Sequence, residues 1–292
     1  LSYCVTSASF PRQPVIVLPG SHSSGKQHSK LWLLPKANRH HLEAMQIEYA
    51  KVSALGDRKD NQDRAAVVVA ENAAMMLVFD GMGGHSDGAK AAETGLKVVQ
   101  DLFMSSDLPV FDPQGFLYLA LSRAHDEVVG LGEDLAVDFR PRATCAICLI
   151  QEGGAFWAHI GDSRIYQVRD GAVLSRSRDH SHVEVLIQEG AITEDEAKDH
   201  PMRNFVECCI GGDAPVPDMS ITGKIELQPG DVLLACSDGL WSGLSDDDMA
   251  EIGAPGDDNL VENLKALSLK ALNVNSPYSD NTTGTALRWT GI

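Results

Sequence analysis

The stretch Val78-Phe79-Asp80-Gly81-Met82-Gly83-Gly84-His85 joins the end of an apolar run to a glycine-rich turn. Residues 75–79 are predicted to form a buried strand, and a helix-like segment comes after the turn. A strand ending in Asp80 places a carboxylate at the rim of a core, and the glycines leave backbone carbonyls open to a ligand. Carboxylate and carbonyl oxygens are the ligands that hard cations prefer. A simple Asp-Gly turn would use the same letters, so the rest of the chain must decide between the two.

Three other predicted strand termini carry an Asp beside small residues. Asp162 and Asp238 each follow a strand, and Asp280 precedes the last strand. Together with Asp63 and Asp80, they form a set of carboxylates whose repulsion would shift their pKa values unless cations neutralised them. The sequence therefore predicts a cation site built from strand ends.

The chemistry of this set points to magnesium or manganese, because the ligands are oxygen atoms and the set contains no His or Cys. Two such ions can hold and activate a bridging water for attack on phosphorus. Arg58 supplies a planar guanidinium that can hold phosphate oxygens.

Composition limits the class of protein. The 292 residues are 43% hydrophobic, enough for one large domain or two modest ones, and the net charge of -17 argues against nucleic acid or an anionic membrane as the main partner. No apolar run approaches the roughly 18 residues of a membrane span. The apolar run Val15 to Leu18 is too short for a signal peptide.

The cysteines indicate buried thiols in a reducing compartment. Cys145 and Cys148 form a C-x-x-C spacing inside an apolar, strand-like run. Residues three apart on a strand face opposite sides, so this pair is not expected to share a metal.

Residues 1–44 differ from the rest of the chain, with five basic residues and one acidic residue. Gly20 to Lys26 resembles a phosphate-binding loop, but Gln27 stands where a Ser or Thr should meet magnesium, and Pro35 interrupts the expected helix. We expect a disordered extension, or a start assigned upstream of Met45. The alternative, an ATPase that uses Lys26, depends on this segment alone.

From Met45 the pattern predicts an α+β fold with antiparallel sheets rather than a doubly wound βαβ fold. Helices with one apolar face are predicted around 92–103, 117–128 and 260–271, and a polar helical stretch over 181–200. A half-buried strand is predicted over 219–227, and Asp170-Gly171 signals a hairpin. The other predicted strands are 47–54, 65–70, 75–79, 144–150, 155–160, 164–169, 172–175, 231–236 and 285–289.

In order and spacing, these motifs resemble the metal-dependent protein phosphatases, the PPM or type 2C family, in their bacterial single-domain form. The resemblance runs from about Ile47 to Trp289. It rests on Arg58 with Asn61-Gln62-Asp63, on Asp80 to His85, and on Gly161-Asp162-Ser163-Arg164, Asp179-His180-Ser181, His200 to Asn204, Asp238 to Trp241, and Asp280-Asn281.

The resemblance implies two antiparallel sheets in a sandwich flanked by helix pairs, a dinuclear Mn2+ or Mg2+ centre and a flap at about 181–212. Asp80 would bridge both ions and the Gly81 carbonyl would bind the second, while Asp238 and Asp280 would bind the first. The remaining roles would fall to Asp63 with Gln62 around the metal-bound waters, to Arg58 on the substrate phosphate, and to Asp162 in a weak third site.

Three positions depart from the family pattern. Gln62 stands where many members have Glu, Met82 where animal members have a His proposed as general acid, and Ser242 where many members have Asp. These departures leave the proton donor unassigned and imply a weak third site. Asp162 could instead cap a turn. We expect structural roles for His85, His180, His200 and Arg203, and an ion pair between Arg164 and a neighbouring carboxylate.

The sequence thus predicts a cytoplasmic, monomeric phosphoserine/phosphothreonine phosphatase over residues 45–292. Its expected partners are phosphorylated proteins, a Ser/Thr kinase and that kinase's targets. No C-x5-R signature supports a cysteine phosphatase. The alternative is a catalytically weak, phosphoprotein-binding regulator. Gln62 and Ser242 favour this alternative, and the retained Asp80, Asp238, Asp280 and Arg58 oppose it.

Overall fold

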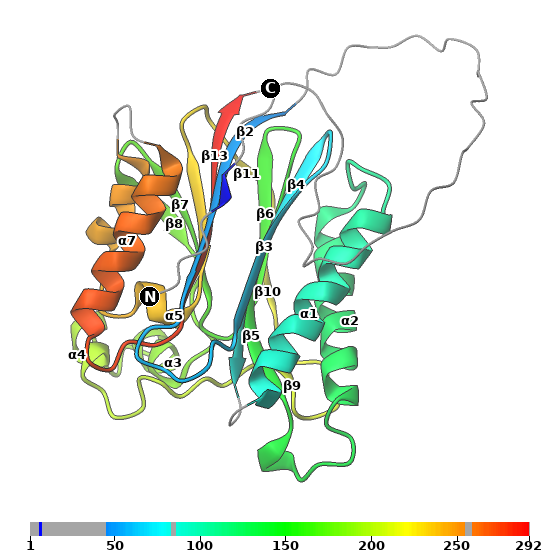
Figure 1. The fold of residues 1–292 in the computed structure, drawn as a ribbon, viewed down its shortest axis with the longest axis vertical. Helices are drawn as coiled ribbons and strands as arrows, with labels where there is room; N and C mark the ends of the chain where they lie inside the picture. Colours follow the sequence, from blue (N-terminus) through cyan, green and yellow to red (C-terminus); the bar gives the residue numbers. More distant parts are fainter. Residues whose placement is uncertain (1–5, 8–44, 83–85, 255–258, 292) are drawn as a thin grey trace, which may run out of the picture.

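A computed structural model of the protein describes residues 6–7, 45–82, 86–254 and 259–291. In this part of the chain two antiparallel sheets face each other, and helices cover both outer faces (Figure 1). The predicted sandwich with helices outside is therefore confirmed. No helix within these ranges combines the length and hydropathy of a membrane-spanning segment.

The first sheet has the strand order β1-β2-β13-β12-β7-β8. Figure 1 shows α7 on its outer face, where α5, α6 and a short 3-10 helix, η2, also pack. The elements of this half are β1 (Thr6–Ser7), β2 (Gln46–Ala54), β7 (Arg164–Arg169), β8 (Ala172–Arg176), β12 (Val232–Cys236), β13 (Thr282–Gly291), α5 (Asp238–Trp241), α6 (Asp246–Ala250), η2 (Glu251–Gly253) and α7 (Leu260–Asn275).

The second sheet has the order β10-β6-β5-β4-β3, with β11 also paired to β6 and β9 to β5. The helices α1 and α2 lie on its outer face (Figure 1). The elements are β3 (Asp63–Val69), β4 (Ala73–Met82), β5 (Arg142–Gln151), β6 (Gly154–Ile160), β9 (Ile210–Gly211), β10 (Ser220–Ile221), β11 (Ile225–Glu226), α1 (Ser86–Ser105), α2 (Pro113–Gly130) and the 3-10 helix η1 (Val137–Phe139).

Three apolar layers hold the sandwich together, one between the sheets and one beneath each set of helices. Alternation along β5 places Cys145 in the layer under α1 and α2, and Cys148 in the layer between the sheets. The prediction that the C-x-x-C thiols face opposite sides is confirmed. All five described cysteines are free thiols.

The predicted hairpin at Asp170-Gly171 joins β7 to β8. Both residues have positive φ, 51° and 74°, as a tight turn between twisted strands requires.

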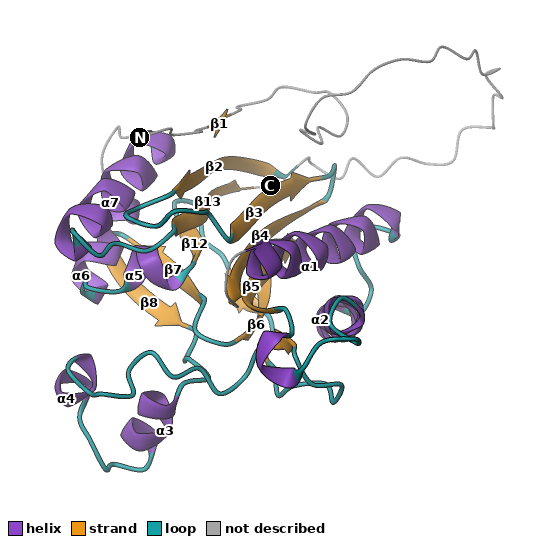
Figure 2. Cartoon of the chain, turned by 60° about the horizontal axis from the view of Figure 1, so that its bottom comes forward, coloured by secondary structure: helices purple, strands orange, loops and turns teal. Residues whose placement is uncertain are grey.

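The helical stretch predicted over 181–200 is wrong in extent, because two short helices share it. The helix α3 (His182–Gln188) ends before Gly190, whose φ of 71° lies in the left-handed region. The helix α4 (Glu194–Lys198) starts at a capping box formed by Thr193 and Glu196. Figure 2 shows both helices standing away from the sheets, within the predicted flap.

The half-buried strand predicted over 219–227 is interrupted. Ile221 pairs with Ala158 and Ile225 with Ala155, so four steps along this segment match three steps along β6. The extra residue makes a bulge at 222–224 that separates β10 from β11. Period-two alternation predicts a continuous strand here and cannot reveal the bulge.

The predicted extension lies mostly outside the described residues. Within it, Thr6–Ser7 form β1 and pair with Lys51 and Ala50 on the edge of β2. His85 also lies outside the described residues, so its expected structural role stays a prediction.

Candidate functional site

The predicted carboxylates lie at one end of the sandwich, because this is where some of their strands begin and the others end. Asp63 begins β3 and pairs across the sheet with Asp80 near the end of β4. Asp162 and Asp238 come two residues after β6 and β12, and Asp280 comes two residues before β13. Antiparallel pairing brings these termini together from both sheets, so the set predicted from the sequence is spatially close.

Asp63 is the most deeply buried of the five, with 3% of its surface exposed. The Ser237 hydroxyl donates to its Oδ2 at 2.8 Å, which fixes the carboxylate. Among the described residues, Oδ1 has no hydrogen-bond partner. A buried, unsatisfied carboxylate oxygen is costly and indicates a position for a water or cation.

Asp280 makes a direct contact with a cationic side chain. Arg58, on the loop before β3, donates from Nη2 to its Oδ2 at 2.5 Å. The Arg58 side chain is 59% exposed, so the guanidinium lies at the rim of the site. Sequence reasoning assigned Arg58 to the substrate phosphate and did not predict this pairing.

Mutual repulsion and burial raise the pKa values of the other four carboxyls. Burial, countered in part by Ser237, raises the pKa of Asp63 to about 7. Burial and the charge of Asp280 raise the pKa of Asp238 to about 6. Burial and the neighbouring carboxylates raise the pKa of Asp80 and of Asp162 well above the usual range. Such a cluster is stable as anions only when positive charge neutralises it.

The donor chemistry fits divalent magnesium or manganese, since it consists of carboxylate oxygens with a backbone carbonyl nearby. Within the described residues, however, no three His, Cys, Asp or Glu side chains already converge as a metal cluster. Cation binding would therefore need the carboxylates to rotate toward a common point, which the ion pair of Asp280 with Arg58 opposes.

The raised pKa values predict how stability changes with pH once metals are removed. A carboxyl whose folded pKa exceeds its unfolded value stabilises the protein below the unfolded pKa, and this contribution is lost as pH rises through the folded pKa. With Asp63 at about 7 and its reference at 3.8, chelator-treated protein should gain thermal stability as the pH falls from about 7 toward 4. Differential scanning calorimetry measures this trend. Manganese at pH 7 should also raise the Tm, whereas a Tm that rises with pH in chelator would contradict the prediction.

The backbone around Gly81 is packed too closely for a side chain. A Cβ on Gly81 would lie 2.1 Å from the carbonyl oxygen of Gly88 in α1, and 2.9 Å from that of Gln62. The Gln62 N–H in turn donates to Asn281 Oδ1 at 2.8 Å, which joins this loop to the residue after Asp280. The glycine is thus required where β4 approaches the start of α1.

Gly81→Ala is expected to destabilise the protein by about 2–4 kcal/mol, because two backbones must separate. Gly130→Ala is the matched control, since a Cβ there meets nothing within 4 Å and Ala favours a helix. Urea denaturation of both variants measures the difference. Equal stability of the two would contradict the close approach.

Asp162 is held by a chain of contacts that sequence reasoning found only in part. The predicted ion pair of Arg164 is confirmed, with Nε and Nη2 donating to Asp179 at 2.8 and 2.7 Å. The guanidinium also stacks on Trp241, 3.4 Å from the ring centroid. Trp241 Nε1 donates to the Asp162 carbonyl at 2.9 Å. Trp241 and Ser237 were missed as site residues, although both lie within three residues of Asp238.

His180, just before the flap, and His200, within it, make hydrogen bonds that agree with the structural roles predicted for them. His180 Nε2 lies 2.9 Å from Ser220 Oγ, and its Nδ1 accepts from the Gly161 N–H at 3.4 Å. His200 Nδ1 accepts from the Met202 N–H at 3.2 Å. Arg203 is exposed.

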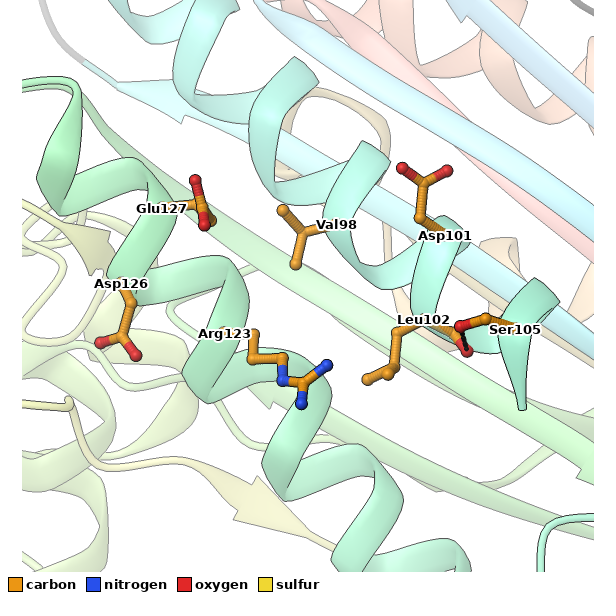
Figure 3. Close-up of a pocket in the computed structure, with 7 residues that line it drawn as sticks. All are labelled: Val98, Asp101, Leu102, Ser105, Arg123, Asp126 and Glu127. Carbon is orange, nitrogen blue, oxygen red and sulfur yellow. Dashed lines mark hydrogen bonds between the residues drawn. The ribbon is translucent and has the colours of Figure 1, made fainter. Parts of the chain in front are cut away.

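A hollow of about 470 Å³ lies away from the carboxylates, between α1 and α2 (Figure 3). Its walls carry both charge signs and two apolar side chains: Val98, Asp101, Leu102, Ser105, Arg123, Asp126 and Glu127. None of the predicted site residues lines it, so this hollow is separate from the carboxylates.

Known proteins resemble this chain over most of its length. The family model "Protein phosphatase 2C" matches residues 52–269. A putative protein phosphatase 2C-type of Streptococcus pyogenes is 35% identical over 182 residues, 61% of this chain and 72% of the relative. The serine/threonine protein phosphatase PstP of Mycobacterium tuberculosis is 31% identical over 70% of this chain, but the match spans 38% of PstP.

A solved structure shares the fold. The catalytic domain of PstP, in complex with two manganese ions, has a TM-score of 0.70 and 26% identity, covering 84% of this chain and 99% of that domain. Asp63, Asp80, Asp162 and Asp238 all lie within the residues that the family model matches.

Proposed function

Because this chain belongs to the protein phosphatase 2C family, we propose that it hydrolyses phosphoserine and phosphothreonine in proteins with the aid of manganese or magnesium. The observation that supports this most directly is the position of five Asp residues at one end of the sandwich, with Arg58 at the rim. Hydrolysis of a phosphate monoester requires positive charge that stabilises the phosphoryl oxygens. Cations held by the carboxylates and the guanidinium of Arg58 would supply this charge.

In this proposal, Asp80, Asp238, Asp280 and the Gly81 carbonyl hold two cations, and Asp162 contributes to a weaker third site. When bound, the cations supply Lewis-acid stabilisation of phosphoryl charge and an activated water. The donor set supports these roles through its oxygen-only chemistry and its raised pKa values.

The chain's own residues orient the reactants. Arg58 can hold phosphate oxygens at the rim, in exchange for its contact with Asp280. Ser237 fixes Asp63, so that Oδ1 stays able to accept a hydrogen bond from a water. Gln62 lies next to Asp63 and contributes no charge.

The decisive test is phosphate release from a phosphothreonine peptide with manganese, magnesium or chelator. We expect metal-dependent release that falls at least about 100-fold in Asp238→Ala, but not in Asp134→Ala, an exposed Asp in the loop after α2. If folded protein releases no phosphate with either metal, the regulator that binds phosphoproteins without hydrolysis replaces the proposal, and Gln62→Glu becomes the next variant.

We further propose that residues 45–292 form the catalytic unit and that 181–212 act as a flap beside the site. The family match within 52–269 supports the first, and the position of α3 and α4 away from the sheets supports the second (Figure 2). Full phosphatase activity of a protein that consists of residues 45–292 would support this catalytic unit, and loss of the activity would contradict it.

The substrates are phosphorylated proteins, and we propose that they include a Ser/Thr kinase and its targets. We also propose that the protein is a monomer in the cytoplasm; a reducing compartment fits the free thiols of the described residues. Size-exclusion chromatography with light scattering tests the monomer.

A further inference from the structure

An aromatic side chain stands exposed two residues before Asp280. Tyr278, in the segment between α7 and β13, has 88% of its surface exposed. In Figure 1 this segment runs from the lower end of α7 to the start of β13, at the end of the sandwich that carries the carboxylates. Single apolar side chains are common on protein surfaces, so exposure alone assigns no function. The position of Tyr278 relative to the site decides its role.

The backbone around Tyr278 is held by hydrogen bonds. Its N–H donates to the Asn275 carbonyl at 2.9 Å. The Asp57 carboxylate accepts from the N–H of Ser279 at 3.0 Å and from its hydroxyl at 2.7 Å, and the Asp57 N–H donates to the Ser279 carbonyl at 2.9 Å. Asp57 precedes Arg58, so these bonds fix Tyr278 relative to the rim of the site. An exposed ring on an ordered backbone can bind a partner with little loss of conformational entropy.

The side chains of this segment alternate between the interior and the surface. Ser279 and Asn281 are 4% and 6% exposed, and both make hydrogen bonds to the loop before β3. Tyr278 and the side chain of Asp280 reach the surface, at 88% and 33% exposure. A period of two is typical of an extended backbone, in which side chains two apart share a side. Tyr278 therefore lies on the side of Asp280, about 6.6 Å away along the backbone.

A phosphorylated residue at the carboxylates would bring its neighbours in the substrate close to Tyr278. Arg58 contacts Asp280 and, in the proposed function, holds the substrate phosphate. Consecutive Cα atoms of a polypeptide are about 3.8 Å apart. A substrate residue one or two positions from the phosphorylated one can therefore reach the ring, whereas a free phosphorylated amino acid has no such residue.

The surroundings of Tyr278 are uncharged. Residues 271–279 contain no charged side chain, although 22% of the whole chain is charged. Val274, in the last turn of α7, is 54% exposed and adds an aliphatic side chain to the same segment. An aromatic ring in such an uncharged segment favours an apolar partner side chain over a charged one.

We propose that Tyr278 is a specificity-determining residue, which binds an apolar side chain one or two positions from the phosphorylated residue of the substrate. The preferred substrates are then phosphoproteins in which apolar residues flank the phosphoserine or phosphothreonine. This inference rests on the proposed function, because it requires the phosphorylated residue to lie at the carboxylates.

The test compares phosphate release, with manganese, from a phosphothreonine peptide flanked by Leu on both sides, the same peptide flanked by Ser, and free O-phosphothreonine. For the wild type we expect kcat/KM to be about tenfold higher with Leu than with Ser flanks, through KM rather than kcat. Tyr278→Ser should remove this preference, whereas Tyr278→Phe keeps the aromatic face and should retain it. Free O-phosphothreonine reports on the reactive centre alone and normalises the peptide values.

Phe111→Ser is the matched control, because Phe111 is an exposed aromatic residue far from the site. The N–H of the preceding Val110 donates to Gln151 at 2.9 Å. Gln151 lies at the end of β5 opposite to Thr144, which pairs with Asp80. Replacing this distant ring should leave the preference for Leu flanks unchanged.

Equal kcat/KM for the two peptides in the wild type, or a preference for Leu that survives in Tyr278→Ser, would overturn the proposal. If none of the substrates releases phosphate, the proposed function fails, and isothermal titration calorimetry of the manganese-loaded protein with the two peptides tests Tyr278 separately. A Kd about tenfold lower for the Leu-flanked peptide, lost in Tyr278→Ser, would support the proposal. Equal affinities, or no binding of either peptide, would overturn it.

Discussion

Asp80→Asn is expected to lower phosphate release at least about 1000-fold, the largest catalytic loss among the variants considered. Asp80 pairs with Asp63 across the β3–β4 ladder, and the charges of Asp63 and Asp238 both act on it. An amide there keeps the shape and removes the charge that would hold a divalent cation.

The same variant should be no less stable than the wild type in chelator, and more stable at neutral pH. The reason is that the pKa of Asp80 is raised in the folded state, so its charge opposes folding at neutral pH. Phosphate-release assays measure the loss of activity, and urea denaturation in chelator measures the gain in stability. Asp134→Asn, at an exposed position, is the control and should change neither quantity.

Turnover of Asp80→Asn within tenfold of the wild type would exclude Asp80 from the centre. A large loss of stability in chelator would instead show that the carboxylate is structural. Opposite effects on activity and stability are what a functional site with unfavourable charges predicts.

Strand ends were predictable from the sequence because their signal is local. An apolar run that stops at an Asp followed by small residues marks both the strand and its end, as at Phe79-Asp80 and Cys236-Ser237-Asp238. Apolar residues at helical spacing predicted α1, α2 and α7 for the same reason. The break between α3 and α4 and the bulge at 222–224 were not predictable, since Gly190 and the register with β6 act through backbone geometry that residue periodicity does not encode.

Contacts between distant segments explain what sequence reasoning missed in the site. Arg58 and Asp280 are 222 residues apart, as are Ser279 and Asp57, whose carboxylate accepts from the Ser279 hydroxyl at 2.7 Å. Each residue taken alone looks like part of a polar loop. Only the pairing of β13 with β2 brings the two loops together.

Arg164→Met is expected to cost about 3 kcal/mol of unfolding free energy, the largest stability loss predicted for a single charged residue here. Asp179 is left with its side chain only 6% exposed and without its two charge-assisted hydrogen bonds. The stacking of the guanidinium on Trp241 is lost as well.

Arg288→Met is the control for Arg164→Met. It shows how much stability is lost when an arginine of a more exposed ion pair is replaced. Arg288 pairs with Glu48 at 2.7 Å and is 20% exposed, close to the 15% of Arg164, but Glu48 is 31% exposed. Solvent can therefore hydrate the remaining carboxylate, and we expect a loss of about 1 kcal/mol. Adding Asp179→Asn to Arg164→Met should recover part of the stability, because the buried charge is removed.

Substitution of Arg164 should also change the manganese dependence of the phosphatase activity, which an ion pair with a structural role alone would leave unchanged. Trp241 donates to the Asp162 carbonyl, so loss of the stacked guanidinium should loosen the loop that carries the proposed third metal ligand. Arg164→Lys, which keeps the charge and loses the planar stack, should then need more manganese for half-maximal activity while its kcat at saturation changes less. An unchanged manganese requirement would limit Arg164 to the fold, and a stability loss no larger than that of Arg288→Met would contradict the buried pair itself.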